Sequence, residues 1–115
     1  KLKIAETGND RSEAFLLSLS GIECGISNIN ANSSWRSTYS NDTEYPATPI
    51  ALGNGTMTYK FVDDDGDLTD DTADIAALYG IGRVGDAVYV QTVTIEPDGN
   101  DMKIIAGSWQ RVTAP

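Results

Sequence analysis

The feature that most constrains this chain is an apolar repeat near its N-terminus. Large apolar side chains recur there at spacings of 4, 3, 4 and 3 residues, which places them on one stripe of an α-helix. They are Phe15, Leu19, Ile22, Ile26 and Ile29. The repeat predicts one amphipathic helix over about residues 10–31. A single helix cannot bury such a stripe alone, so the rest of the chain must supply a packing partner.

The predicted helix has a start signal and two internal glycines. Asp10 followed by Glu13 resembles a capping box, and Gly8 just before it is a local helix breaker. Gly21 and Gly25 each weaken a helix by up to ~1 kcal/mol relative to alanine. Two readings of these glycines stay open, because they either allow a neighbouring backbone to come close or are merely tolerated.

The remainder of the chain carries β-hairpin signals. A long polar segment at 36–54 predicts an ordered loop, and alternating or β-branched segments after it predict strands. The predicted strands are 56–62, 73–84, 87–96 and 102–112. Short turns between them favour an antiparallel order. The sequence thus predicts an α+β fold with one domain over 1–115, in which the N-terminal helix packs on a four-stranded antiparallel meander at about 56–112.

Composition excludes several function classes. The 115-residue chain has a net charge of −9 and a pI near 4.1, so we expect no nucleic-acid partner. It has no histidine, which removes the Ser-His and Cys-His nucleophile pairs. Cys24 is its only cysteine, so no internal disulfide forms, and we interpret it as a small, partly buried side chain. These counts predict a protein that is not an enzyme and has no catalytic residues.

An acidic run is the strongest chemical signal. Six carboxylates fall within the nine residues 63–71. The spacing does not match an EF-hand, because Phe61 and Thr72 would occupy its first and last ligand positions. Two readings stay open: a solvated hairpin loop, and a calcium site that uses oxygen ligands. The candidate metal ligands are Asp63, Asp65, Asp67, Asp70 and Asp71.

Weaker signals concern aromatic residues and asparagines. Trp35 and Trp109 each stand beside polar residues, where a ring either stacks on a sugar or packs against the core; packing is the better interpretation. Three segments match the N-glycosylation pattern and fit an extracytoplasmic surface; they start at Asn32, Asn41 and Asn54.

Several local strings resemble the type IV pilins and pseudopilins, in particular minor-pilin subunits. In that group the helix carries a pattern like Ala-Glu-Ser-Gly-Ile-Glu, and this chain matches it at Ser20-Gly21-Ile22-Glu23 but not at Ser18 and Leu19. The helix exit, the first strand and the last strand also resemble that group. The strings are Asn30-Ala31-Asn32-Ser33-Ser34-Trp35-Arg36, Leu52-Gly53-Asn54-Gly55-Thr56 and Ser108-Trp109-Gln110-Arg111-Val112.

The resemblance implies a structural role. It implies the head domain of a subunit in a type IV pilus or a type II secretion pseudopilus, with other pilin or pseudopilin subunits as partners. It also implies an upstream apolar helix half that anchors the protein in the inner membrane, and a periplasmic or cell-surface location. The chain lacks an initiator Met, so we expect that such a segment has been removed. Some members of this group hold calcium in a loop of the head, which adds interest to the acidic run.

Two further expectations concern surfaces. The helix face opposite the apolar stripe, with Glu13, Glu23 and Asn30, is predicted to be available to neighbouring subunits. The alternative to a filament subunit is a calcium-dependent extracellular binding or adhesion module. That module would use the acidic loop together with Trp35 or Tyr39.

Overall fold

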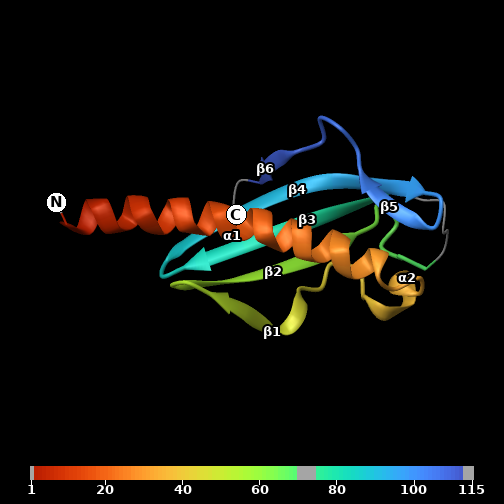
Figure 1. Ribbon diagram of the computed structural model, residues 1–115, viewed down its shortest axis with the longest axis horizontal. Helices are drawn as coiled ribbons and strands as arrows, with labels where there is room; N and C mark the ends of the chain where they lie inside the picture. The colour runs from red at the N-terminus through yellow and green to blue at the C-terminus, as the bar shows by residue number, and fades with distance from the viewer. Residues whose placement is uncertain (1, 70–74, 113–115) are drawn as a thin grey trace.

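The computed structural model describes the backbone of residues 2–69 and 75–112, and the side chains of 10–69 and 75–112. Its elements follow the order α1 (Leu2–Asn30), α2 (Trp35–Thr38), β1 (Tyr45–Leu52), β2 (Gly55–Val62), β3 (Ala76–Val84), β4 (Ala87–Asp98), β5 (Asp101–Ile104) and β6 (Gln110–Val112). The strands form one antiparallel sheet. The long helix α1 packs on one face of it (Figure 1). The predicted α+β class and helix-on-sheet arrangement are therefore confirmed.

The predicted number of strands is wrong, because the described sheet has six strands and not four. Its order is β1-β2-β3-β4-β5, and β6 also pairs with β4. The first additional strand, β1, lies inside the segment 36–54 that was predicted to be a loop. Pro46 and Pro49 hide it in the sequence, yet proline is tolerated on an outer strand. Gly53, with a φ of +59°, and Asn54 form the tight turn that joins β1 to β2.

The second additional strand arises because the predicted strand 102–112 is interrupted. β5 pairs with residues 95–98 of β4, and β6 pairs with residues 90–92. Between them the chain leaves the sheet at Gly107, whose φ is +79°. The Ser108 hydroxyl then accepts a hydrogen bond from the Thr94 amide at 3.0 Å, which returns the chain to the β4 edge.

The helix also begins earlier than predicted. α1 starts at Leu2, so Gly8 does not break it, and Asp10 lies inside the helix and not at its cap. The physical reason is that one glycine costs only about 1 kcal/mol, while extending an existing helix is cheap compared with nucleating a new one. At the other end α1 stops at Asn30, one residue before the predicted end.

The face of α1 that meets the sheet is rotated from the predicted stripe. Ile22 and Ile29 are buried as expected, but Phe15, Leu19 and Ile26 are only half-buried. Small residues take their place, and the buried positions of α1 are Ala14, Leu17, Ser18, Gly21, Ile22, Gly25 and Ile29. The reason is a close approach to the sheet. A Cβ added at Gly21 would lie 2.6 Å from the Thr58 carbonyl oxygen, so of the two readings of this glycine the close approach is correct.

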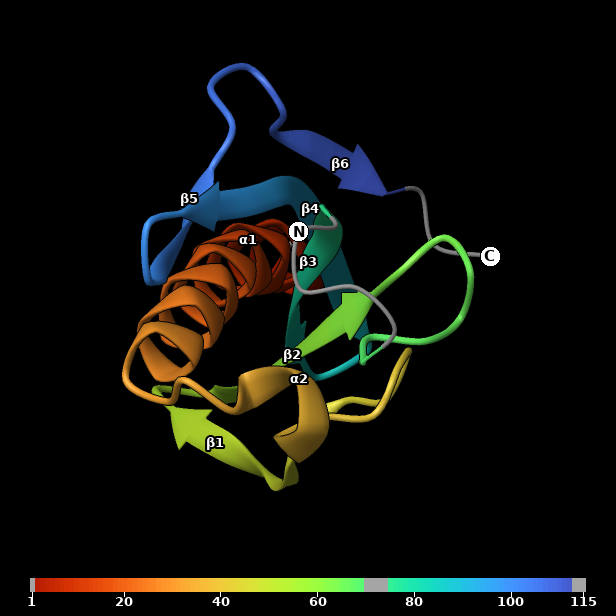
Figure 2. The ribbon, with the colours of Figure 1, turned by 90° about the vertical axis from the view of Figure 1, so that its right-hand side faces the viewer.

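Glycines on β3 complete this contact. A Cβ at Gly80 would overlap the Ser18 carbonyl oxygen, and one at Gly82 would overlap that of Ala14. The sheet curls around the helix, as a view along α1 shows (Figure 2). On either side of the glycines lie the larger core residues. Met57, Tyr59 and Phe61 of β2, predicted to share one face, are all buried.

Candidate functional site

The acidic loop follows β2 and is organised by its own backbone. The carboxylate of Asp63 accepts a hydrogen bond from the Asp65 amide at 3.2 Å, and that of Asp65 accepts one from the Asp67 amide at 2.9 Å. The carboxylate of Asp67 accepts both the amide and the hydroxyl of Thr69. These bonds from Thr69, the hydroxyl first, hold the pKa of Asp67 below its usual value. The alternate aspartates thus act as turn formers.

The predicted calcium ligands are only partly within the described residues. Asp63 is buried, whereas Asp65 and Asp67 are exposed. Asp70 and Asp71 lie outside the described residues. Within 10–69 and 75–112, no three His, Cys, Asp or Glu side chains gather as a metal site would require. The calcium site therefore stays a prediction.

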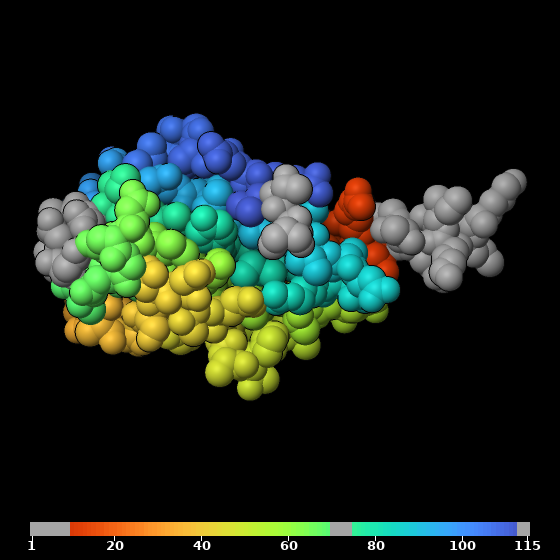
Figure 3. Space-filling model, turned by 180° about the vertical axis from the view of Figure 1, so that it is seen from behind, coloured from red at the N-terminus to blue at the C-terminus, as the bar shows by residue number. Residues whose placement is uncertain are grey.

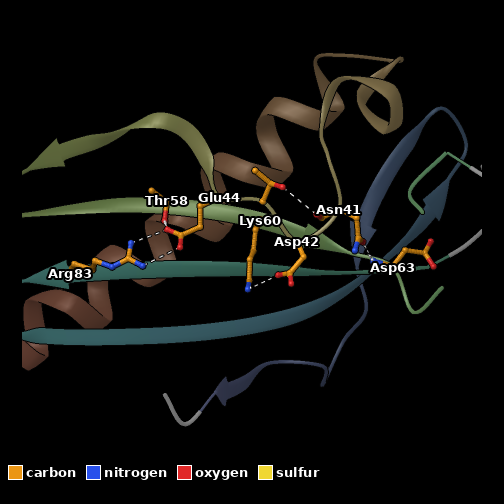
Figure 4. A network of polar contacts seen from close by, with 8 residues as sticks. Asn41, Asp42, Glu44, Thr58, Lys60, Asp63 and Arg83 are labelled. Atoms are coloured by element: carbon orange, nitrogen blue, oxygen red, sulfur yellow. Dashed lines mark hydrogen bonds and ion pairs between the residues drawn. The ribbon is translucent and has the colours of Figure 1, made fainter. Parts of the chain in front are cut away.

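The segment before β1 crosses to the face of the sheet opposite α1 (yellow in Figure 3). Its Glu44 carboxylate accepts a hydrogen bond from the buried Thr58 hydroxyl at 2.6 Å and pairs with both terminal nitrogens of Arg83 at 2.9 and 3.1 Å (Figure 4). The Arg83 guanidinium, more than the Thr58 hydroxyl, lowers the pKa of Glu44. The same bond raises the pKa of Arg83. Glu44 therefore binds this segment to β2 and β3.

Two further contacts in Figure 4 also attach the segment before β1 to the sheet and to the acidic loop. Lys60 donates to the Asp42 carboxylate at 2.7 Å, and its amine lies 5.1 Å from the centre of the Tyr79 ring. The Asn41 side-chain oxygen accepts the Asp63 amide at 2.7 Å, so the same segment also supports the start of the acidic loop. We interpret this network as structural.

The aromatic residues of the adhesion alternative belong mainly to the core. Trp35 is buried, with its ring 5.4 Å from that of Phe61, so packing was the correct reading for this residue. Tyr39 is half-buried, and its hydroxyl lies 3.3 Å from that of Tyr59. Burial, followed by this hydrogen bond, raises the pKa of Tyr39 well above its usual value. Trp109, by contrast, is 44 % exposed.

The remaining sequence candidates lie apart from one another. Cys24 is half-buried in α1, as predicted, with the Asn28 amide 3.6 Å from its sulfur. Among the asparagines of the glycosylation pattern, Asn54 is exposed at the β1–β2 turn. The side chain of Asn32 donates to Thr38 and accepts from the Ser34 amide at the start of α2.

The outer helix face was predicted to be available to neighbouring subunits, and two of its three residues form hydrogen bonds within the chain. Glu13 accepts a hydrogen bond from the Asn54 amide at 2.8 Å. Asn30 accepts one from the Met102 amide at 2.8 Å and donates one to its carbonyl at 3.1 Å. Glu23 is exposed as predicted. Long polar side chains at the margins of a helix reach back to the sheet, which a helical wheel cannot reveal.

The surface of the described residues also contains two hollows. One of about 650 Å³ lies between the start of α2 and the β4–β5 turn, where Ser34, Arg36 and Asp101 contribute to its lining. The other, of about 470 Å³, lies between the N-terminal half of α1 and the start of β4, where Phe15, Leu16 and Tyr89 form its apolar walls. Sequence reasoning missed the second hollow because it placed Phe15 in the core.

No family model, no curated protein and no solved structure matches this chain. Among the described helices, none combines the length and the apolar character needed to cross a bilayer.

Proposed function

We propose that this chain is a non-enzymatic structural subunit of a filament of the type IV pilus or type II secretion pseudopilus kind. In this proposal the sheet and the C-terminal part of α1 form a head on the filament surface. An upstream continuation of α1 anchors the subunit in the inner membrane before assembly. Its partners are other pilin-like subunits, and its location is extracytoplasmic.

The observation that carries the proposal is the placement of α1. The helix has 29 residues, and its first turns extend beyond the sheet while the remainder packs on it (Figure 1). A helix that protrudes from a head is a suitable connection between the surface and the interior of a filament. The short strings that resemble those of pilins, at residues 20–23, 30–36 and 52–56, also support the proposal.

The test is to find the chain in filaments. Filaments sheared from the cells that produce it should contain this chain by mass spectrometry, and the encoded protein should carry about twenty apolar residues upstream. A strain in which the gene is deleted is the control for the peptide assignment. Recovery of the chain only from the cytosol, or an upstream segment without an apolar stretch, would contradict the proposal.

The alternative is a calcium-dependent extracellular binding or adhesion module. The acidic loop favours it, because exposed carboxylates at Asp64, Asp65 and Asp67 follow closely along the chain. A calcium site there would raise the melting temperature by several degrees at millimolar calcium, since a ligand that binds only the folded state stabilises it. The rise should disappear in the double variant Asp65→Ala, Asp67→Ala and persist in the charge-matched control Asp98→Ala, Asp101→Ala. An unchanged melting temperature would exclude this alternative.

A further inference from the structure

An apolar hollow opens beside the N-terminal half of α1. It has a volume of about 470 Å³ and is lined by Arg11, Ser12, Phe15, Leu16 and Tyr89. The rings of Phe15 and Tyr89 meet edge to face at 5.1 Å, and Leu16 is 59 % exposed. The hollow therefore offers apolar surface that the fold itself leaves uncovered.

One cation lines this hollow, and a second lies over a ring that lines it. Arg11 is part of its lining, and the Arg111 guanidinium lies 4.6 Å from the centre of the Tyr89 ring. The other described cations are engaged elsewhere. Lys60, Arg83 and Lys103 form ion pairs, and Arg36 is buried. Among the side chains that the structure describes, Arg11 and Arg111 are thus the exposed cations without an ion-pair partner.

This distribution is informative in a chain with a net charge of −9. Unpaired arginines beside an exposed apolar surface favour a partner that presents carboxylates around an apolar side chain.

The end of the folded molecule far from the hollow presents carboxylates beside an exposed apolar side chain. Asp64 and Asp67 are exposed in the acidic loop, and Ile75, which precedes β3, is 53 % exposed. Since β3 and β4 are antiparallel neighbours, Ile75 lies at one end of the sheet, and Tyr89, near the start of β4, lies at the other. Figure 1 shows the β3–β4 turn beside the N-terminal half of α1, with α2 and β5 at the far end.

We propose that the hollow docks the acidic end of a second copy of this chain. Ile75 of one copy packs against Leu16 and Phe15 of the next. Asp64 and Asp67 of the first copy face Arg11 and Arg111 of the second. A contact between two different surfaces repeats from copy to copy and does not close on itself by symmetry, so it builds an open filament. This inference rests on the proposed function and names the surfaces through which the heads meet.

Cysteine cross-linking tests the geometry. In a Cys24→Ser background, the pair Leu16→Cys, Ile75→Cys treated with a short bismaleimide should give a ladder of dimers, trimers and larger products. The matched pair Leu16→Cys, Leu52→Cys, which joins the exposed Leu16 to another exposed leucine, should not. Dimers from Leu16→Cys alone would indicate that hollow meets hollow and would overturn the proposal, as would the absence of a ladder.

Charge reversal tests the electrostatic part. Arg11→Glu should reduce the ladder at least about fivefold at low salt, and so should Asp64→Arg, because each places like charges together. The combination of both in one chain should restore it. Lys103→Glu, which changes the net charge as Arg11→Glu does, should leave the ladder intact. Failure of the combination to restore it would overturn the pairing.

The outcomes separate this contact from the proposed function. If sheared filaments contain the chain but no ladder forms, the docking contact is wrong and the filament role stands. If a ladder forms but the chain is absent from filaments, the contact is real and the filament role is wrong.

Discussion

Gly21 faces the sheet at a point where a larger side chain does not fit. A Cβ there would lie 2.6 Å from the Thr58 carbonyl oxygen and 3.2 Å from the Gly80 Cα, both backbone atoms. At Gly25 the nearest atoms would be a methyl carbon of Leu78 at 2.8 Å and two ring carbons of Tyr59 at 3.3 Å, all of them side-chain atoms. Two glycines four residues apart on one helix therefore differ in how much an added methyl group costs.

We predict that Gly21→Ala lowers the free energy of unfolding by about 1–2 kcal/mol, because the steric cost exceeds the roughly 1 kcal/mol gained in helix propensity. Gly25→Ala, the matched control, should change it by less than about 1 kcal/mol, since the two effects nearly cancel. Urea unfolding of both variants measures the difference. A Gly21→Ala variant as stable as the wild type would contradict the close packing.

Glu44 provides a pH dependence with a defined sign. Its pKa is lowered in the folded state by Arg83, so its ionised form stabilises the fold. That contribution is fully present above the pKa that the Glu44 carboxyl has in the unfolded chain, near 4.3. It is lost as the pH falls through the lower pKa that this carboxyl has in the folded state. It should amount to less than about 1 kcal/mol because the side chain is partly exposed.

The prediction for this residue is that Arg83→Gln raises the pKa of Glu44, measured by carbon NMR titration. Glu44→Gln should flatten the loss of stability between about pH 5 and pH 3, because the titrating group is removed. The exposed Glu23→Gln serves as the charge-matched control. An unchanged Glu44 pKa in Arg83→Gln would show that the pair does not form in solution.

Among the elements, β5 is tied to α1 by hydrogen bonds from a helix side chain. Its Met102 amide and carbonyl both bond to the side chain of Asn30, so the last residue of the helix acts as a neighbouring strand would. Glu13 plays a similar part for the β1–β2 turn through the Asn54 amide. The helix thus holds strands at both margins of the sheet as well as covering its centre.

Asn30→Ala should therefore weaken β5 locally. We expect a loss of about 1–2 kcal/mol, because two backbone groups lose their partner. Amide hydrogen exchange at Met102 should accelerate, while exchange at the β2–β3 pairs should change little. Ser27→Ala, at an exposed position one turn earlier, is the control. If the Met102 amide exchanged equally slowly in both variants, the proposal that the Asn30 side chain stabilises β5 would be wrong.

The whole molecule is elongated, with extents of 51 × 28 × 23 Å and a radius of gyration of 14.8 Å. A compact domain of this length would have a radius of gyration of about 13 Å. The difference comes from α1, whose first turns extend past the sheet (Figure 1). Asp10, whose carboxylate lies near the β3–β4 turn at Gly85, is close to the point where the helix reaches the sheet.

Removal of residues 1–9 should consequently leave the packed head intact. The free energy of unfolding should change by less than about 1 kcal/mol, because these turns of the helix extend past the sheet (Figure 1). Small-angle scattering should show a smaller radius of gyration. A loss of cooperative unfolding would mean that the first turns of α1 belong to the core. Removal of residues 1–17, which takes Ala14 and Leu17 from the core, is the destabilised control.

Local patterns determined much of this fold from the sequence alone. The 3.6-residue repeat identified α1 over most of its length, and the alternation at 56–62 correctly placed Met57, Tyr59 and Phe61 on one buried face. Both patterns are set by the spacing of residues that are close in the sequence, so they can be recognised without the tertiary structure. The acidic run was equally visible, but whether it binds calcium depends on a geometry that composition does not contain.

Only the tertiary structure decided the rotation of α1, the identity of β1 and the surroundings of Arg11. The helix turned its small residues to the sheet because Gly80 and Gly82, some sixty residues away, leave room for them. β1 became a strand because β2 offered it a free edge, although its own prolines argue against a strand. Arg111 lies over the Tyr89 ring, which lines the same hollow as Arg11, because β4 and β6 pair with each other. These outcomes depend on register and distance between segments remote in sequence, which no local pattern encodes.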